Sequence, residues 1–244
     1  MYHLATISLV QLDPELRPIN HASACLVNYR NHLFVLTVSH ATGNQGNWAI
    51  EMRYVPDKGV ELYQLGAMRF LEGFRIKHNK LKSQKIDFSY KLLLEPPAPR
   101  HQILSTTGAI LEDEPKYIVP SDLTLAPDAS EQYGFWGLTR QTFDSHNLVA
   151  EPKLELGMKF DRTEGDRFFF KTREPYKTFK DYYGCSGAPI LDDSGKLVSL
   201  VVEGDKNKTG IYGLDLRTYR CALDVEIDMA LNGAPATPPV QPTQ

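Results

Sequence analysis

A serine between two glycines is the residue of this chain best suited to act as a nucleophile. It occurs in the run Gly184-Cys185-Ser186-Gly187-Ala188-Pro189. Glycines allow the backbone to turn tightly and to present its N–H groups. Acyl transfer needs such groups, because they stabilise the negatively charged oxygen of the tetrahedral intermediate. The motif therefore indicates acyl-transfer chemistry at Ser186.

Serine is a weak nucleophile until a base removes its proton, so this chemistry also requires a histidine and a carboxylate that orients it. An apolar strand pattern runs into His40, and Asp87 begins a second strand pattern. Between His40 and the middle of the chain, the other aspartates are Asp57, in a predicted turn, and Asp113, in an acidic stretch. His40, Asp87 and Ser186 are therefore the candidate catalytic residues.

The sequence resembles the trypsin/chymotrypsin family in the order and separation of these three motifs. That family has a Thr-x-x-His strand end, an aspartate at a strand start and a Gly-x-Ser-Gly-x-Pro segment, and the present chain matches all three. The segment 134–137 is similar to the glycine–tryptophan strand that opens the second barrel of the family. The resemblance covers roughly residues 20 to 230.

The resemblance implies a role for each residue of the motifs. His40 would act as general base and then as general acid, Asp87 would orient His40, and Ser186 would attack the scissile carbonyl. Backbone N–H groups of the segment Gly184, Cys185 and Ser186 would form the oxyanion hole. The implied function is a serine endopeptidase that forms an acyl-enzyme intermediate on a specific protein or peptide substrate.

Substrate-binding positions follow from the same resemblance. The segment Val202-Glu203-Gly204 would bind the substrate backbone as an added antiparallel strand, and Tyr212 would line the specificity pocket. Lys180 and Asp181 fall near the base of that pocket. Asp181 and Glu203 favour a basic side chain before the scissile bond (the P1 residue), whereas Lys180 favours an acidic one. The prediction is a basic P1 residue.

Cys185 stands where secreted members of the family carry an aspartate that pairs with a new N-terminus after activation cleavage. This departure indicates that such an ion pair does not switch the protein on, and it leaves constitutive assembly and ordering by a partner protein as alternatives. Cys185 is not the predicted nucleophile, because the pattern Gly-x-nucleophile-Gly would then need glycine at Tyr183 and Ser186. We expect Cys185 to be a small buried residue beside the site.

Short strand patterns separated by turn residues dominate the sequence and predict an all-β fold. Two halves with several strands each indicate two packed barrels or sandwiches. The resemblance implies two antiparallel six-stranded β-barrels, as in chymotrypsin. The residues 222–231 predict a short C-terminal helix. The predicted divisions are an N-terminal barrel with His40 and Asp87 (1–110), a connection (111–130), a C-terminal barrel with Ser186 and the helix (131–233), and a disordered proline-rich tail (234–244).

The bulk composition narrows the classes of partner. The chain has 244 residues, 42% of them hydrophobic and 23% charged, with a formal net charge of −3. No basic field is therefore expected for nucleic acid or membrane lipid, and we interpret the small basic cluster at residues 77–85 as a solvated loop. The sequence contains no phosphate loop, dinucleotide fingerprint or His-Glu-x-x-His motif, so it predicts no cofactor and no metal.

Cysteine usage and the ends of the chain bear on the compartment. The N-terminus lacks a charged region followed by a long apolar stretch, and no apolar run approaches the ~20 residues of a membrane span. Cys25, Cys185 and Cys221 are odd in number and widely spaced, unlike a disulfide framework or a paired zinc-ligand pattern. The prediction is a cytoplasmic protein.

Two other functions compete with a protease. A protease fold can serve as a catalytically inactive interaction module, although this sequence keeps the complete triad and oxyanion motif. An esterase or acyltransferase would use the same chemistry, but α/β-hydrolases carry the reverse order, Ser-Asp-His. The sequence does not predict the oligomeric state.

Overall fold

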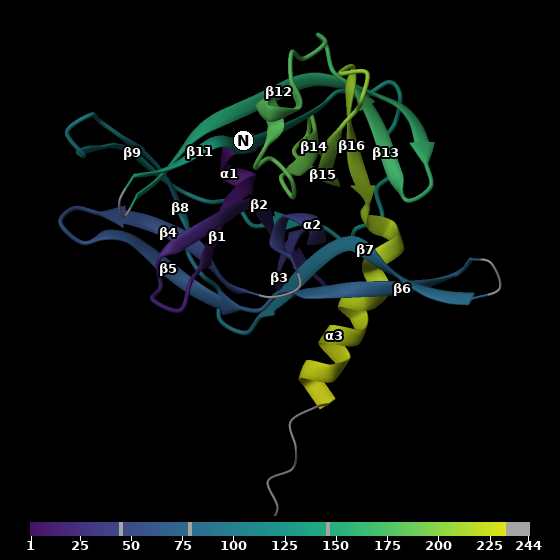
Figure 1. Cartoon of the computed structure of the whole chain (residues 1–244), viewed down its shortest axis with the longest axis horizontal. Helices are drawn as coiled ribbons and strands as arrows, with labels where there is room; N and C mark the ends of the chain where they lie inside the picture. The colour runs from purple at the N-terminus through teal and green to yellow at the C-terminus, as the bar shows by residue number, and fades with distance from the viewer. Residues whose placement is uncertain (44–45, 78–79, 145–146, 233–244) are drawn as a thin grey trace, which may run out of the picture.

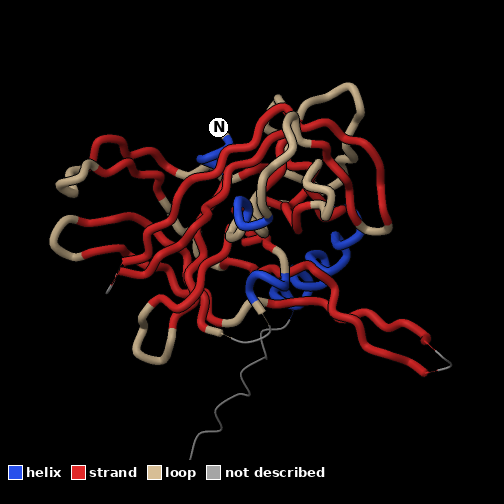
Figure 2. Tube along the Cα trace, turned by 45° about the horizontal axis from the view of Figure 1, so that its top comes forward, coloured by secondary structure: helices blue, strands red, loops and turns tan. Residues whose placement is uncertain are grey.

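The computed structural model describes residues 1–232 apart from 44–45, 78–79 and 145–146. Strands make up most of this trace (Figure 2). They form an eight-stranded sheet in the first half, a closed six-stranded barrel in the second half and a separate two-stranded hairpin (Figure 1). The proline-rich tail, which was predicted to be disordered, lies outside the described residues.

The first half of the chain contains two short helices and seven strands: α1 (Tyr2–Ala5), β1 (Thr6–Leu12), β2 (Pro18–Tyr29), β3 (His32–Thr37), α2 (Ser39–Thr42), β4 (Asn47–Val55), β5 (Gly59–Gly66), β6 (Arg69–Lys77) and β7 (Lys80–Leu93). The strands follow the order β5-β4-β1-β2-β3-β7-β6, and β10 pairs with β2. The hydrogen-bonded path therefore has β5 and β6 at its two ends, where the sequence predicted a six-stranded barrel.

Between the first sheet and the barrel lie β8 (Arg100–Leu104), β9 (Ile110–Pro115) and β10 (Val119–Pro120). β8 falls within the predicted N-terminal barrel (1–110), but it pairs with β9 in the separate hairpin. The second half contains β11 (Tyr133–Asp144), β12 (Asn147–Glu164), β13 (Arg167–Lys171), η1 (Phe179–Tyr182), β14 (Pro189–Asp192), β15 (Leu197–Gly204), β16 (Gly210–Asp215), η2 (Leu216–Tyr219) and α3 (Arg220–Asn232). Its strands close into the order β11-β12-β13-β16-β15-β14. The all-β chymotrypsin-like architecture with a C-terminal helix is thus confirmed.

The β2–β3 hairpin shows why the local sequence adopts this structure. Its two-residue turn, Arg30-Asn31, has φ angles of 49° and 63°. Positive φ at both positions suits the twist of a tight hairpin, and asparagine tolerates it well. One face of the hairpin, including Phe34 and Leu36, packs into the core between the two halves, and the other, including Leu26 and Val35, packs inside the first sheet. Because both faces are buried, the end of β3 is held firmly.

The structure differs from the sequence interpretation at residues 77–85, of which 78–79 are not described. They were interpreted as a solvated loop, but β6 and β7 pair from Arg69↔Tyr90 out to Lys77↔Lys80. The sequence did not indicate these strands, because a two-stranded ribbon exposed on both faces does not need alternating apolar residues.

In the part of the chain that the structure describes, no helix has the length and apolar character needed to cross a membrane.

His21 on β2 makes the stability of the fold sensitive to acid. Its side chain is buried, and its Nε2 lies 2.8 Å from the Oγ of Ser8. Burial lowers the pKa of His21 to about 4 from an ordinary value of 6.5. The unfolded chain therefore binds the additional proton between these values, so stability is lost as the pH falls from about 6.5 to about 4.

We expect the His21→Gln variant to lose less stability in acid than the wild-type protein. The wild-type free energy of unfolding should fall by about 2.5 kcal/mol through His21 between pH 7.5 and pH 4.5. Urea unfolding at both values measures the difference, with His32→Gln as a control at a histidine that is not fully buried. Equal acid-induced losses in the wild-type protein and in His21→Gln would contradict the expectation.

Candidate active site

The pairing of β3 with β7 brings His40 and Asp87 together. Thr37 of β3 lies opposite Ser89 of β7, so the residues that follow Thr37 meet those that precede Ser89. His40 lies in the single turn of α2, and the adjacent Ser39 hydroxyl donates a hydrogen bond of 2.9 Å to the carbonyl oxygen of Ile86. This bond attaches α2 to β7 immediately beside Asp87.

Three contacts join Asp87 to His40. The backbone N–H of His40 donates to Oδ1 of Asp87 at 2.9 Å, and the ring Nδ1 lies 3.0 Å from Oδ1 and 2.9 Å from Oδ2. A carboxylate beside Nδ1 favours the tautomer in which Nδ1 carries the proton and Nε2 is a free acceptor. That Nε2 lies 2.9 Å from the Oγ of Ser186. The three predicted residues thus form a continuous chain of contacts.

The electrostatics of Asp87 suit a permanently charged carboxylate. Burial alone would raise its pKa, but the hydrogen bonds and charge of His40 outweigh this effect and hold the pKa of Asp87 below its ordinary value. Arg167 lowers that pKa further, to a smaller extent. The Asp87 side chain is 18% exposed, whereas that of His40 is 47% exposed. The carboxylate is therefore sheltered, and the imidazole is open to a bound substrate.

The loop that carries Ser186 is fixed between the two halves. Gly184 and Gly187 have φ angles of 96° and 88°, in the region that favours glycine. The Ser23 hydroxyl donates to the carbonyl oxygen of Gly184 at 2.7 Å, and the Gly187 N–H donates to the carbonyl oxygen of Val201 at 2.8 Å. A Cβ atom on Gly187 would overlap the Thr37 hydroxyl and the carbonyl oxygen of Ser23.

Two backbone N–H groups of this loop are available to a ligand. In the described structure neither Gly184 nor Ser186 donates its N–H to an intramolecular acceptor. The N–H of Cys185 points elsewhere, since it donates to the carbonyl oxygen of Tyr182 at 3.0 Å. Of the three residues predicted for the oxyanion hole, only Gly184 and Ser186 therefore offer free donors.

Cys185 is buried, as the sequence analysis expected. Its side chain is inaccessible and packs against Gly137, where an added Cβ atom would lie 2.8 Å from the Sγ atom. Burial raises the pKa of the Cys185 thiol to about 12. A buried thiol that resists ionisation is a poor nucleophile, because the thiolate is the reactive form. These observations oppose a cysteine-based mechanism.

We expect only one of the three cysteines to react with iodoacetamide in the native protein. Cys25 and Cys185 are buried and Cys221 is exposed. Peptide mass spectrometry should therefore find Cys221 alkylated under native conditions and all three cysteines alkylated in urea. Rapid native alkylation of Cys185 would show that the loop before Ser186 opens in solution.

Three of the predicted specificity residues, Glu203, Tyr212 and Asp181, have an intramolecular partner. The carboxylate of Glu203 forms an ion pair with Arg167, and the Tyr212 hydroxyl donates to Glu164 at 3.1 Å. The carboxylate of Asp181 accepts the N–H of Thr178 at 3.2 Å, within its own turn. The Lys180 side chain lies outside the described residues. Because both acidic groups are engaged, the structure adds no support to a basic P1 residue, which stays a prediction.

The segment predicted to bind the substrate backbone lies beside the nucleophile. The carbonyl oxygen of Val202 on β15 lies 3.1 Å from the Oγ of Ser186. Glu203 and Gly204 continue this strand.

Sequence reasoning did not identify Ser23, which positions the loop that carries Ser186, or Ser39, which positions α2. Their partners are distant in sequence, so no local pattern could have signalled these roles.

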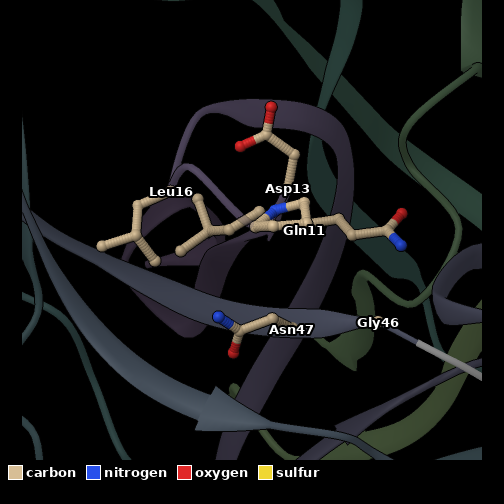
Figure 3. A pocket seen from close by; sticks show the side chains of 7 residues that line it. Gln11, Asp13, Leu16, Gly46 and Asn47 are labelled. Carbon is tan, nitrogen blue, oxygen red and sulfur yellow. The ribbon is translucent and has the colours of Figure 1, made fainter.

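A shallow hollow of about 410 Å³ lies at the turn between β1 and β2 (Figure 3). It is lined by Gln11, Leu12, Asp13, Pro14, Leu16, Gly46 and Asn47. The Asp13 carboxylate accepts the backbone N–H groups of Glu15 and Arg17 and the Nε–H of Arg17, so it stabilises its own turn. Across all the described residues, no group of three or more His, Cys, Asp or Glu side chains is arranged to hold a metal ion.

No family model and no curated protein matches this sequence, whereas many solved structures match the fold. Mouse neuropsin, described as a serine protease, is 14% identical with a TM-score of 0.55, covering 93% of this chain and 97% of that chain. Human heparin binding protein is 11% identical with a TM-score of 0.57, covering 93% of this chain and 92% of that chain. A scabies mite inactivated protease paralogue is 12% identical with a TM-score of 0.56, covering 93% and 92%.

These comparisons define the class of fold. The chain has the fold of trypsin/chymotrypsin-like serine proteases, as its motifs predicted. At identities this low the likeness extends to the fold alone, and one of the similar proteins is an inactivated paralogue. Whether this chain is active therefore depends on its own site.

Proposed function

We propose that this protein is a trypsin-like serine endopeptidase that uses His40, Asp87 and Ser186. The observation that carries the proposal is the continuous contact chain from the Asp87 carboxylate through the His40 ring to the Ser186 hydroxyl, with steps of 2.9–3.0 Å and 2.9 Å. These separations lie within the reach required for proton transfer between nucleophile and base. The substrate would be a protein or peptide, as for the proteases that share the fold.

In the proposed reaction, the Ser186 hydroxyl oxygen attacks the scissile carbonyl carbon while its proton passes to Nε2 of His40. The new oxyanion would accept hydrogen bonds from the Gly184 and Ser186 N–H groups, each such donor being worth about 3 to 4 kcal/mol. The His40 cation, stabilised by Asp87, then protonates the leaving amine. Water repeats the sequence on the acyl-enzyme and regenerates Ser186.

The substrate backbone would add as an antiparallel strand to β15 near Val202, beyond Leu200, where the pairing of β15 with β14 ends. This placement would bring the scissile carbonyl beside Ser186, because the Val202 carbonyl oxygen is within 3.1 Å of the Ser186 hydroxyl.

The cysteines of this chain are free thiols. We therefore also propose a reducing, cytoplasmic compartment, where thiols persist.

A fluorophosphonate tests the proposal directly, because it reacts with serines that are activated by a base and an oxyanion hole. We expect one adduct on the intact protein, located at Ser186 by peptide mass spectrometry and absent in Ser186→Ala. Ser194→Ala, which changes a turn serine elsewhere in the second half, should label like the wild-type protein. A folded protein that forms no adduct when purified and also none in cell lysate would indicate an inactive interaction module instead.

A further inference from the structure

The loop that carries Ser186 rests against one face of the β11–β12 pair. Gly137 of β11 packs directly against Cys185, because a Cβ atom at Gly137 would lie 2.8 Å from the Cys185 Sγ atom. Phe135 lies two residues earlier on the same strand and therefore on the same face. Its ring contacts that of Tyr182, with the centroids 6.1 Å apart. The residues that precede the nucleophile are thus packed on the wall of the second barrel.

Tyr182 is also bound to β12 through its hydroxyl group. That hydroxyl donates a hydrogen bond of 2.7 Å to the carboxylate of Glu155, which lies opposite Phe135 in the strand pairing. The Nζ atom of Lys153 lies 3.6 Å from the same carboxylate and 4.9 Å from the centroid of the Tyr182 ring. Tyr182 is buried and the Glu155 side chain is 14% exposed. The bond is therefore sheltered from water and flanked by a cation.

The chemistry of the two groups makes this bond a strong one. A hydrogen bond to a carboxylate is about twice as strong as one between neutral groups. Burial and the neighbouring Glu155 carboxylate raise the pKa of the Tyr182 hydroxyl far above its ordinary value, so the hydroxyl keeps its proton and remains a donor. Without that hydroxyl, a sheltered carboxylate would lose its donor, which is costly.

One tight turn connects Tyr182 to the oxyanion-hole donors. The carbonyl oxygen of Tyr182 accepts the Cys185 N–H at 3.0 Å, so the backbone turns at Gly184, whose φ is 96°. The Ser23 hydroxyl holds the Gly184 carbonyl oxygen from the first half of the chain. The N–H groups of Gly184 and Ser186 lie within and directly after this turn. A displacement of Tyr182 would therefore displace both donors.

We propose that the Tyr182–Glu155 hydrogen bond holds the Gly184 and Ser186 N–H groups in the position that catalysis requires. Tyr182 and Glu155 are then positioning residues, and this inference rests on the proposed peptidase function. The bond joins two internal segments of the chain, so assembly of the oxyanion hole depends on no newly formed N-terminus. It thereby takes the place of the activating ion pair, which the buried Cys185 thiol cannot form.

Removal of the Tyr182 hydroxyl can be followed at the neighbouring thiol, without any need for catalytic activity. In native Tyr182→Phe, iodoacetamide should alkylate Cys185 about five times faster than in the wild-type protein, or more, because a lost buried hydrogen bond favours local opening by about that factor. Cys25, which lies in a different core cluster, should stay protected. Peptide mass spectrometry over time measures both rates. A general loss of stability would instead expose Cys25 and Cys185 together.

The rate at which a fluorophosphonate acylates Ser186 tests the catalytic part of the inference. This rate should fall about tenfold or more in Tyr182→Phe, since the oxyanion donors are displaced. Glu155→Leu should lower it similarly. Glu155→Gln keeps an acceptor oxygen, although a neutral one, and should label within about threefold of the wild-type rate.

Tyr133→Phe is the matched control for both measurements. It removes another hydroxyl from a buried tyrosine of the same barrel, one that donates to the Asp128 carbonyl oxygen at 3.0 Å. This variant should behave like the wild-type protein. A wild-type protein that forms no adduct would refute the peptidase itself. With an active wild-type protein, unchanged acylation of Tyr182→Phe, or equal exposure of Cys25 and Cys185 in it, would overturn this inference alone.

Discussion

Replacing Asp87 by asparagine is expected to lower the rate at which Ser186 is acylated by about 10⁴-fold while the protein stays folded. The carboxylate of Asp87 accepts from both the backbone N–H and the ring Nδ1 of His40. An amide can present its NH₂ group to Nδ1, which favours the tautomer with the proton on Nε2. A protonated Nε2 in a neutral ring cannot remove the Ser186 proton.

The acylation rate of Asp87→Asn can be measured with the fluorophosphonate under pseudo-first-order conditions, alongside thermal unfolding. Asp57→Asn provides a matched control, since Asp57 is exposed in the β4–β5 turn with a φ of 64°, which asparagine tolerates. It should label at the wild-type rate. A rate for Asp87→Asn within tenfold of the wild-type protein would show that Asp87 does not orient the base.

Replacing Gly187 by alanine is expected to destabilise the fold by about 2 to 5 kcal/mol. A side chain at its φ of 88° costs about 1 to 2 kcal/mol. The added Cβ atom also overlaps the Ser23 carbonyl oxygen and the Thr37 hydroxyl, and forcing atoms into a packed site costs about 1 to 3 kcal/mol. Because Gly187 follows Ser186 directly, acylation of Ser186 should be lost with it.

Urea unfolding of Gly187→Ala beside Gly165→Ala separates the two costs. Gly165 has a φ of 64° and open space around its added Cβ atom, so only the backbone cost of about 1 to 2 kcal/mol applies there. Equal destabilisation of the two variants would mean that the first half of the chain moves away from the Ser186 loop in solution. The greater loss at Gly187 is the expected result.

Local sequence patterns were sufficient for the features that depend on nearby residues. The β2–β3 hairpin follows from apolar runs on both sides of Arg30-Asn31, because a two-residue turn determines the register of its own strands. The helix predicted over 222–231 is confirmed as α3, Arg220–Asn232. The candidate catalytic residues were found through motifs whose order and spacing match a known family, and their roles stay a prediction.

Only the tertiary structure decided the features that depend on distant residues. The Ser23 hydroxyl holds the Gly184 carbonyl oxygen across 161 positions of sequence, and Arg167 pairs with Glu203 from another strand of the barrel. Neither contact has a local signature, because Ser23, Arg167 and Glu203 are polar residues in ordinary strand patterns and Gly184 contributes only its backbone carbonyl oxygen. The outer part of the β6–β7 hairpin also required the structure, since an exposed ribbon buries too little apolar surface to leave an alternating pattern in its sequence.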